Sequence, residues 1–290
     1  MKSNTTLTSS FQSPRMSERK YRDFRDFIYA ECGINLSPGK KTMLTSRLMK
    51  RLRALGMTSF DQYYDYLCDP RCRSEEITKM IDVVTTNKTE FFREANHFDF
   101  LLSQALPTLY QSRPLTARNR LNVWSAGCST GEEPYTLAMV LAEFFKDNKE
   151  GNFSMLATDI STKVLTAAKC AIYPKELVES VSPMLKHKYL MRGKGSQTGL
   201  YRVVPELRGR VIFQRINLTG STFGIRSPMD IIFCRNVIIY FDRQTQIILF
   251  KKLYNQLSPG GYLFIGHSES LHGVNDQFVP VATCVYRKPA

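Results

Sequence analysis

The stretch VWSAGCSTGEEPYTLAMVL, from Val123 to Leu141, contains an apolar run, a loop of small residues and a helical segment, in that order. A buried strand followed by a glycine-rich turn and a helix is the usual start of a nucleotide-binding unit in a parallel sheet. Glu132 and Glu133, however, stand where a phosphate-binding loop keeps a lysine or bare backbone N–H groups. The stretch therefore predicts an α/β fold whose ligand contains a nucleoside but no phosphate.

Downstream of this stretch, strand-like runs alternate with helical segments. The apolar runs are RLNVWSAG, FSMLATDIS, GRVIFQRINL, MDIIFCRN and GYLFIGHSES, which begin at residues 120, 153, 209, 229 and 261. Continuous apolar strands separated by helices indicate a doubly wound, mostly parallel sheet that is covered on both faces. A last stretch, FVPVATCVYRKP from Phe278, suits one closing antiparallel edge strand.

The chain divides into segments of different pattern. The Ser/Thr/Asn-rich residues 1–15 are expected to form a disordered tail. Residues 16–86 show helical periodicity, with Ser59 and Asp61 as candidate caps of the third helix and with Gly33 and Gly56 at helix ends, which predicts a small all-α domain. Residues 87–119 are expected to be a linker and connecting helix, and 120–290 the ligand-binding domain. Within the latter, residues 188–210 predict a small antiparallel β flap.

The composition is that of a globular chain with a large excess of positive charge. Hydrophobic residues make up 43% of the 290, and the formal net charge is +14, which attracts polyanions or acidic protein surfaces alike. The N-terminal segment lacks the apolar core of a signal peptide, and no run of about 18 apolar residues occurs, so we expect no membrane insertion. The seven cysteines are odd in number and lack metal-ligand spacing. They favour reduced thiols, no metal site and a cytoplasmic protein.

Much of the positive charge lies in one helical segment. KKTMLTSRLMKRLR, residues 40–53, has six basic residues and no acidic one. The apolar stripe at helical spacing consists of Leu44, Leu48, Leu52 and Leu55. It leaves most of the other faces to four basic residues, Arg47, Lys50, Arg51 and Arg53. Two interpretations remain open: a solvated helix face, or a docking surface for an acidic partner.

Polar residues follow several of the predicted parallel strands, at the edge where such sheets bind ligands. Asp159 ends one strand and can bind ribose hydroxyls, while Asn217 and Arg235–Asn236 end two others. Glu132 or Glu133 would repel a pyrophosphate but can bind an ammonium group or a hydroxyl. A ligand that joins adenosine to an amino acid without phosphate satisfies this set, and S-adenosylmethionine is such a ligand. A helix-start acid pair stabilised by the helix dipole explains one glutamate but not the whole set.

Five segments carry a resemblance to a known family. They are NKTEFFRE, WSAGCSTGEEPYTLAM, ATDIS, INL and FCRNVIIYF, which begin at residues 87, 124, 157, 216 and 233. Together they resemble the chemotaxis receptor methyltransferase family, CheR, from about Met16 to Lys288. The resemblance implies a cytoplasmic bacterial enzyme, recruited to membrane receptor arrays, that transfers the methyl group of S-adenosylmethionine to glutamate side chains of methyl-accepting chemotaxis receptors as methyl esters.

The resemblance also implies roles for individual residues. The implied cofactor contacts are Asn87, Thr89, Arg93, Glu133, Asp159, Asn217, Leu218, Arg235 and Asn236. Arg93 and Tyr240 are implied to lie beside the transferred methyl group as the catalytic residues. Receptor cytoplasmic helices are acidic, which favours the basic helix as their docking surface, and in some family members the β flap binds a peptide from the receptor's C-terminus.

The chemistry agrees with the histidine pattern. A glutamate carboxylate is ionised at neutral pH, so its attack on a sulfonium methyl group needs no general base. We therefore interpret the four histidines as structural, least firmly His267 at a strand end; they are His97, His187, His267 and His272.

Two other functions compete with this interpretation. An RNA or DNA methyltransferase would explain the charge, but CRNVIIY is not the Asn/Asp-Pro-Pro-aromatic motif of amino-group methylases, and the basic helix lacks interleaved aromatics. We therefore expect no nucleic-acid partner. A non-catalytic, cofactor-binding receptor adaptor would lack the residues beside the methyl group, whereas Arg93 and Tyr240 are both present.

Overall fold

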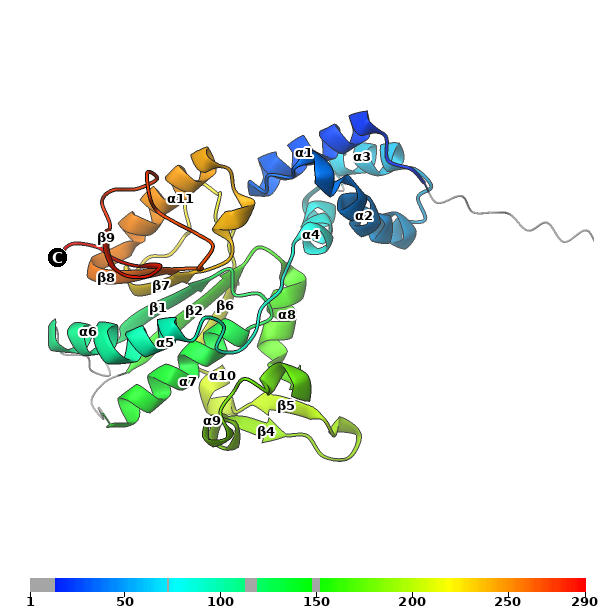
Figure 1. Cartoon of the computed structure of the whole chain (residues 1–290). Coiled ribbons are helices and arrows are strands. Elements are labelled where there is room, and N and C mark those ends of the chain that lie inside the picture. The colour runs from blue at the N-terminus through cyan, green and yellow to red at the C-terminus, as the bar shows by residue number, and fades with distance from the viewer. Residues whose placement is uncertain (1–13, 72, 113–118, 148–151) are drawn as a thin grey trace, which may run out of the picture.

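The computed structural model describes residues 14–71, 73–112, 119–147 and 152–290. A helical domain lies at one end of an α/β domain, and a small β sheet projects from another side (Figure 1). The predicted disordered tail, residues 1–15, lies outside the described residues except for its last two positions.

The N-terminal domain consists of helices, as predicted. These are α1 (Glu18–Cys32), the short 3₁₀ turn η1 (Pro38–Lys40), α2 (Lys41–Leu55), α3 (Phe60–Cys68) and α4 (Arg73–Val84). The Ser59 hydroxyl accepts a hydrogen bond from the N–H of Gln62 and caps α3, and Gly33 and Gly56 end α1 and α2. Ser59 and the two glycines are therefore confirmed as helix ends, whereas Asp61, the other predicted cap, lies inside the first turn of α3.

The core of the helical domain is formed by the apolar stripes of its helices. Leu44, Leu48 and Leu52 on α2 are completely buried, which confirms these three members of the predicted stripe. The fourth, Leu55, is only partly buried at the end of the helix. Phe24 of α1 stacks on Tyr63 of α3 with ring centroids 5.9 Å apart. Packed aromatic pairs of this kind stabilise a small domain beyond the area that they bury.

A buried ion pair joins α2 to α4. Nε and Nη2 of Arg51 each lie 2.8 Å from an oxygen of Glu76, and the Tyr63 hydroxyl donates to the same carboxylate at 2.9 Å. The Glu76 side chain is only 3% exposed, so its charge depends on these partners. Arg51 therefore stabilises the domain core.

The basic face of α2 differs from the expectation. Lys50 and Arg53 are exposed, but Arg51 is held by Glu76, and Arg47 donates to the carbonyl oxygen of Val84 and the hydroxyl of Thr86. The expectation that all four basic residues lie on an exposed face is wrong for Arg47 and Arg51. Both point toward α4, which packs against this side of α2.

In the described part of the chain, the larger domain is built on a seven-stranded sheet. Its strands are β1 (Leu121–Ala126), β2 (Phe153–Asp159), β6 (Val211–Arg215), β7 (Met229–Cys234), β8 (Leu257–Ile265), β9 (Val279–Ala282) and β10 (Val285–Arg287). Their order is β6-β2-β1-β7-β8-β10-β9, with all pairs parallel up to β8 and antiparallel beyond it. The predicted doubly wound, mostly parallel sheet is confirmed. The order reverses between β1 and β7, which is where such sheets bind ligands.

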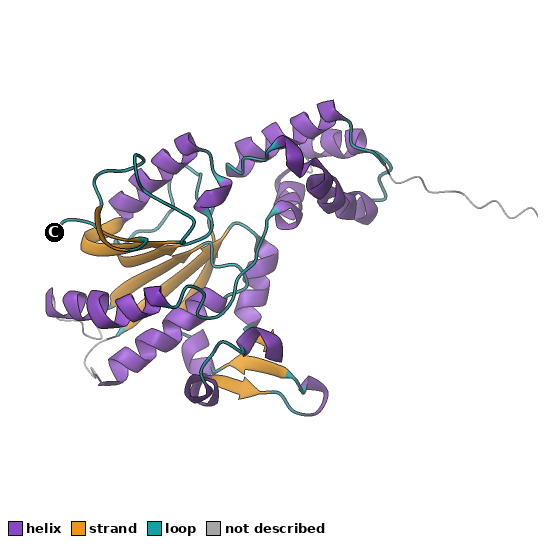
Figure 2. Ribbon diagram, in the orientation of Figure 1, coloured by secondary structure: helices purple, strands orange, loops and turns teal. Residues whose placement is uncertain are grey.

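Helices cover both faces of this sheet (Figure 2). One face carries α7 (Glu132–Asp147), α8 (Thr162–Cys170) and a continuous helical run of α5 (Asn96–Phe100), the π-helical η2 (Leu101–Ala105) and α6 (Leu106–Ser112). The other face carries α11 (Arg243–Gln256). Alternate strand residues enter the two cores: Ile231 and Phe233 face α7, whereas Ile232 and Cys234 face α11. This alternation explains why the strands are apolar throughout.

A second, three-stranded sheet forms the predicted flap. Its strands are β3 (Ile172–Pro174), β5 (Leu200–Val203) and β4 (Leu190–Arg192), antiparallel in that spatial order. The short elements η3 (Lys175–Val178), α9 (Pro183–Tyr189), η4 (Gly195–Gln197) and α10 (Pro205–Arg208) complete it. The range expected from the sequence, 188–210, contains β4 and β5 but not β3, which comes earlier in the chain.

The C-terminal stretch is a hairpin, not one edge strand. β10 pairs with β8, and β9 then pairs with β10 at the sheet edge. The reversal occurs at Thr283 and Cys284, where Cys284 has a φ of 57°. A turn without glycine or proline explains why the sequence pattern looked continuous.

Helices of the described residues are all too short or too polar to cross a membrane. The six described cysteines form no disulfide; Cys32, Cys128 and Cys234 are buried, whereas Cys68 and Cys170 are exposed. The expectation of reduced thiols thus agrees with the described part of the structure.

Replacement of Arg51 by alanine is expected to destabilise the protein. The change leaves the buried Glu76 carboxylate without its cation, and breaking a buried pair in this way costs about 3 kcal/mol or more. Urea unfolding followed by circular dichroism measures the loss. The exposed neighbour Arg53→Ala is the matched control, with a change within about 0.5 kcal/mol. Equal stability of the two variants would show that the ion pair contributes nothing.

Candidate active site

A cavity of about 430 Å³ lies beyond the carboxyl ends of β1, β2, β6 and β7, under the helical domain. All ten residues expected at the cofactor or the methyl group line it: Asn87, Thr89, Arg93, Glu133, Asp159, Asn217, Leu218, Arg235, Asn236 and Tyr240. The chain thus brings together residues that are spread over more than half of its length. Of the proposed docking residues, Arg47 also lines this cavity, whereas Lys50, Arg51 and Arg53 do not.

The loop after β1 passes close to the loop after β7. Gly127 has a φ of 84°, and a Cβ at this position would overlap the Val237 side chain. The N–H groups of Gly127 and Cys128 both donate to the carbonyl oxygen of Thr158 at the end of β2. The glycine therefore lets three strand ends meet around the cavity, which is a physical reason for the small-residue loop.

Asp159 is a buried carboxylate at the end of β2. One oxygen accepts the N–H of Ser129 at 2.9 Å, and the other accepts the N–H of Ser161 at 2.9 Å. Burial raises the pKa of Asp159, and these backbone hydrogen bonds oppose the shift. Each oxygen keeps a further lone pair, so the fixed carboxylate can still accept hydroxyl groups from a ribose.

Glu133 and Arg235 form a charged pair inside the cavity. Arg235 Nη1 lies 3.3 Å from Glu133 Oε2, and the Ser125 hydroxyl donates to Oε1 at 2.7 Å. Burial raises the pKa of Glu133, and Arg235 opposes the rise. Glu133 lines the cavity but Glu132 does not. Glu132 instead accepts a hydrogen bond from the Thr130 hydroxyl, so the two glutamates of the loop have separate roles.

Glu94 holds the other side of Arg235. Its Oε2 lies 2.9 Å from Arg235 Nη2, and its Oε1 accepts the N–H of His267 at 3.2 Å. Burial acts to raise the pKa of Glu94, but Arg235 and the His267 N–H outweigh it and hold the pKa below its usual value. The guanidinium, whose side chain is 2% exposed, is thus fixed between two carboxylates from different segments.

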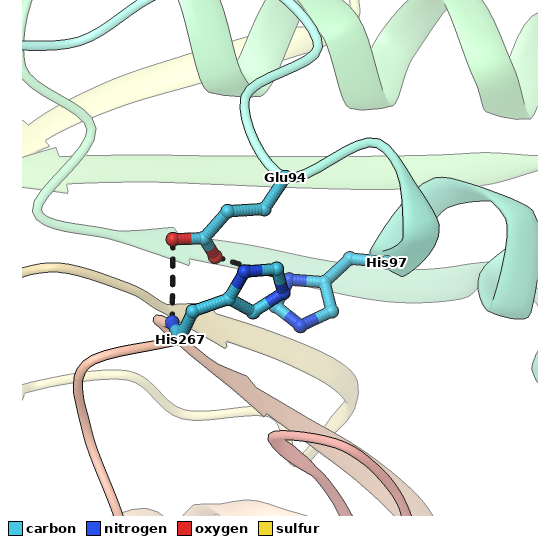
Figure 3. A group of neighbouring side chains, drawn as sticks. All are labelled: Glu94, His97 and His267. Carbon is cyan, nitrogen blue, oxygen red and sulfur yellow. Dashed lines mark hydrogen bonds and ion pairs between the residues drawn. The ribbon is translucent and has the colours of Figure 1, made fainter.

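His97 and His267 lie beside Glu94 (Figure 3). His97 Nδ1 is 3.5 Å from Glu94 Oε2, the two rings have centroids 5.0 Å apart, and burial lowers the pKa of His97 to about 4. One atom of each of the three residues lies within 4.8 Å of the others, which is close enough to hold a metal ion. A divalent cation bound there would share the Glu94 carboxylate with the Arg235 guanidinium, and the two positive charges would repel each other. We therefore assign the group to the support of Arg235.

Arg93 lies in a tight turn on the cavity wall. Its neighbours Phe92 and Glu94 have φ values of 55° and 58°, which is costly for residues with side chains. Nη1 of Arg93 donates to the carbonyl oxygen of Lys88 at 3.2 Å, and the side chain is half-buried. The turn directs the Arg93 side chain along the cavity wall and the Glu94 side chain toward Arg235.

Asn217 is engaged by the protein itself. Its Nδ2 donates to the carbonyl oxygen of Glu31 at 2.8 Å, and its Oδ1 accepts both the N–H and the hydroxyl of Thr219. The side chain therefore joins the end of α1 to the loop after β6. Nδ2 keeps a second N–H group beyond the bond to Glu31, and Asn217 lines the cavity, so its side chain can still donate to a ligand.

The helical domain fixes two further sides of the cavity. Asp82 on α4 accepts hydrogen bonds from the hydroxyls of Ser161 and Thr162 at 2.6 and 2.8 Å, at the start of α8. The N–H of Asn35 donates to the carbonyl oxygen of Tyr240 at 2.8 Å. The helical domain, for which the sequence predicts only a docking role, thus also helps to form the cavity.

Two carboxylates near the cavity were missing from the predicted site, Glu94 and Glu269. Glu94 lies in the quoted segment NKTEFFRE, but nothing local indicates that Arg235 is its partner. Glu269 was quoted within the run GYLFIGHSES, where it is the acid after a predicted strand. Three residues separate Glu269 from Ile265, the last residue of that strand, so the sequence carries only a weak signal for it.

Family models match nearly all of the chain. The model of the CheR methyltransferase SAM-binding domain matches residues 87–286, and that of the CheR methyltransferase all-alpha domain matches residues 19–85. The chain belongs to the CheR methyltransferase family.

Relatives support the same assignment over the full length of the CheR-family chain. A chemotaxis protein methyltransferase of Klebsiella aerogenes is 39% identical to it over 98% of this chain and 94% of the relative. The corresponding proteins of Escherichia coli K12 and Borreliella burgdorferi are each 39% identical, over 93% and 90% of this chain and 91% of each relative. The chain is an S-adenosylmethionine-dependent methyltransferase of chemotaxis, and methylation of protein glutamate is the standard role of its family.

Replacement of Asp159 by alanine is expected to weaken cofactor binding. The loss of a charge-assisted hydrogen bond costs about 1.5–3 kcal/mol, or roughly tenfold or more in affinity. Calorimetry with S-adenosylmethionine measures the change, and the exposed Asp99→Ala is the matched control. Unchanged affinity in a folded Asp159→Ala protein would show that this carboxylate does not hold the ribose.

Cofactor affinity is expected to fall in acid. Because burial raises the pKa of both Asp159 and Glu133, each takes up a proton above the usual carboxyl range and then loses its charge. Below the higher of the two pKa values, the dissociation constant should rise by up to about tenfold per pH unit. Calorimetry from pH 7 down to the lowest pH at which circular dichroism shows a folded protein tests this. A constant affinity over this range would contradict the requirement for ionised carboxylates.

Proposed function

We propose that this protein transfers the methyl group of S-adenosylmethionine to the γ-carboxylate of glutamate side chains on methyl-accepting chemotaxis receptors. The observation that carries the proposal is the cavity at the sheet switch point, which gathers an acceptor for hydroxyls, an acid for an ammonium group and a cation for a carboxylate. Asp159, Glu133 and Arg93 fill these roles. The family match and the names of the relatives support the chemotactic context.

The residues around the cavity fit a zwitterionic nucleoside without phosphate. Asp159 receives the ribose hydroxyls, and Glu133, fixed by Ser125 and Arg235, receives the amino group. The remaining members of the proposed cofactor set are Asn87, Thr89, Asn217, Leu218 and Asn236. The apolar wall that includes Leu218 and Val237 receives the base. S-adenosylmethionine supplies an activated methyl group.

Arg93 and Tyr240 are the residues that we place beside the methyl group. The target carboxylate is ionised at neutral pH, so the protein supplies alignment and water exclusion and needs no general base. A salt bridge from Arg93 to the nucleophile would stabilise the ground state more than the transition state. We therefore assign Arg93 to anchoring the cofactor's carboxylate or positioning the substrate, and Tyr240 to contact with the reacting methyl.

The receptor helix docks on the exposed part of α2 in this proposal. Lys50 and Arg53 are exposed, and Lys40 is exposed and also lines the cavity. Arg47, one turn from Lys50 on the helix, lines the cavity as well. The positive charge therefore runs from the outer face of α2 to the mouth of the cavity. An acidic receptor helix on this face brings a glutamate toward the methyl group, in the cytoplasm below the receptor array.

The flap is a second docking surface in the proposal. β3 and β4 are both edge strands of the small sheet, and Ile172 and Met191 on them are 44% and 41% exposed. An exposed edge with apolar side chains can accept an extended peptide as a further strand. The flap is thus suited to hold a C-terminal receptor peptide as a tether.

The function is tested by incubating the protein with methyl-labelled S-adenosylmethionine and receptor-containing membranes, followed by mild alkali. Glutamyl methyl esters release labelled methanol, whereas N-methyl groups do not. Arg93→Ala is expected to bind receptor membranes and to transfer little methyl. Alkali-stable label on nucleic acid would instead indicate a nucleic-acid methyltransferase. Cofactor binding without any transfer would indicate the receptor adaptor.

Charge reversal at Lys50 and Arg53 is expected to reduce receptor methylation. Charges at an interface act mainly on encounter and register and are screened by salt. At low ionic strength, the double variant Lys50→Glu, Arg53→Glu should methylate receptors at a rate reduced about fivefold or more. Its affinity for the cofactor should stay the same. Added salt should slow the wild-type protein and reduce its advantage.

A control variant separates local charge from net charge. Lys146→Glu, Lys251→Glu changes the net charge equally at exposed positions on α7 and α11. It should retain the wild-type rate. Equal rates for both double variants would show that the exposed face of α2 is only solvated. Arg51 is not suitable for this test because its replacement removes the partner of buried Glu76.

A further inference from the structure

Glu269 follows β8 and is buried against the loop after β7. Its carboxylate accepts four backbone N–H groups. Oε1 accepts those of Ile238 and Ile239 at 2.8 and 3.3 Å, and Oε2 accepts those of Asn236 and Gly266 at 3.0 and 2.6 Å. Three of these donors belong to the loop that carries Asn236 and leads to Tyr240. Glu269 is only 7% exposed, so these hydrogen bonds are buried.

The loop that Glu269 holds has a costly backbone conformation. Asn236 has a φ of 56°, which costs on the order of 1 kcal/mol or more and persists only where surrounding contacts enforce it. Gly266 leaves room for it, since a Cβ there would lie 2.9 Å from the Asn236 nitrogen. The turn from Gly266 to Glu269 and the loop from Asn236 to Tyr240 are therefore fitted to each other.

A carboxylate is the side chain that this arrangement requires. Four N–H donors need four acceptor sites, and an ionised carboxylate offers four and carries no hydrogen to oppose them. Burial raises the pKa of Glu269, while hydrogen bonds from the four N–H groups oppose the rise because they stabilise the ionised carboxylate. Unpaired, the same buried N–H groups would each destabilise the loop.

We infer that Glu269 is a positioning residue for methyl transfer, which fixes the backbone from Asn236 to Tyr240 and thereby places Tyr240 against the transferred methyl group. The inference rests on the proposed function for the role of Tyr240. Its geometric part, the holding of the loop by one carboxylate, does not depend on that role. Glu269 lies outside the cavity lining and acts through the loop.

The variant Glu269→Gln tests the inference. Its amide nitrogen would meet two N–H donors, so the loop should shift while the side-chain volume stays the same. Small misplacements of reacting groups cost up to about 10²-fold. We therefore expect kcat at saturating cofactor and receptor to fall about thirtyfold or more, with the receptor KM within about twofold, because docking uses α2 and the flap. The exposed acid Asp276→Asn is the matched control and should keep the wild-type kcat.

Unchanged kcat in a folded Glu269→Gln protein would overturn the inference, and so would a loss confined to receptor KM. A second measurement uses the wild-type protein and does not depend on the folding of a variant. Amide hydrogen exchange at Asn236, Ile238 and Ile239 should be as slow as in strand interiors, and unprotected exchange there would also overturn it. Failure of the methyl-ester assay with the wild-type protein would refute the proposed function alone, since hydrogen exchange still reports on the contacts of Glu269.

Discussion

The arrangement of the active site depends on one buried guanidinium. Arg235 lies between Glu133 at the start of α7 and Glu94 from the turn before α5, over the rings of Phe98 and Phe233. Moving the guanidinium away from either carboxylate leaves a buried negative charge uncompensated, which costs about 3–5 kcal/mol. The guanidinium can therefore keep its place only if three distant segments keep theirs. The glycine loop, the strained turn and the strand end are thereby held in fixed relation before any ligand enters.

The sequence predicted those features whose signals are local. The apolar runs predicted the parallel strands, and position at a strand end was enough to select Asp159 and Asn217. The family segments then selected Glu133 over Glu132. The hairpin at the C-terminus was read as one strand because its turn, at Thr283 and Cys284, contains neither glycine nor proline. Helical spacing placed Arg51 off the apolar stripe of α2, but it carried no information on where α4 would pack.

The rest of the site could not be predicted because it consists of pairs that are distant in sequence. Glu94 meets Arg235, and Glu269 meets the loop of Asn236, through folding of the whole sheet. A single carboxylate in a sequence offers no sign of which donors it will face. Asn217 shows the converse, since a residue at a strand end can use its side chain for the protein's own contacts, here with Glu31 and Thr219.

The hydrogen bonds of Asp82 to the start of α8 have a consequence for the architecture as a whole. Ser161 donates its hydroxyl to Asp82 and its N–H to Asp159, so a residue of the helical domain and the carboxylate proposed to bind ribose share one partner. Sub-domains joined at such a point lose the freedom to unfold separately, and they should melt as one cooperative unit. For evolution, the helical domain is thus not an interchangeable module. A foreign helical domain grafted onto this sheet would have to reproduce the carboxylate at position 82.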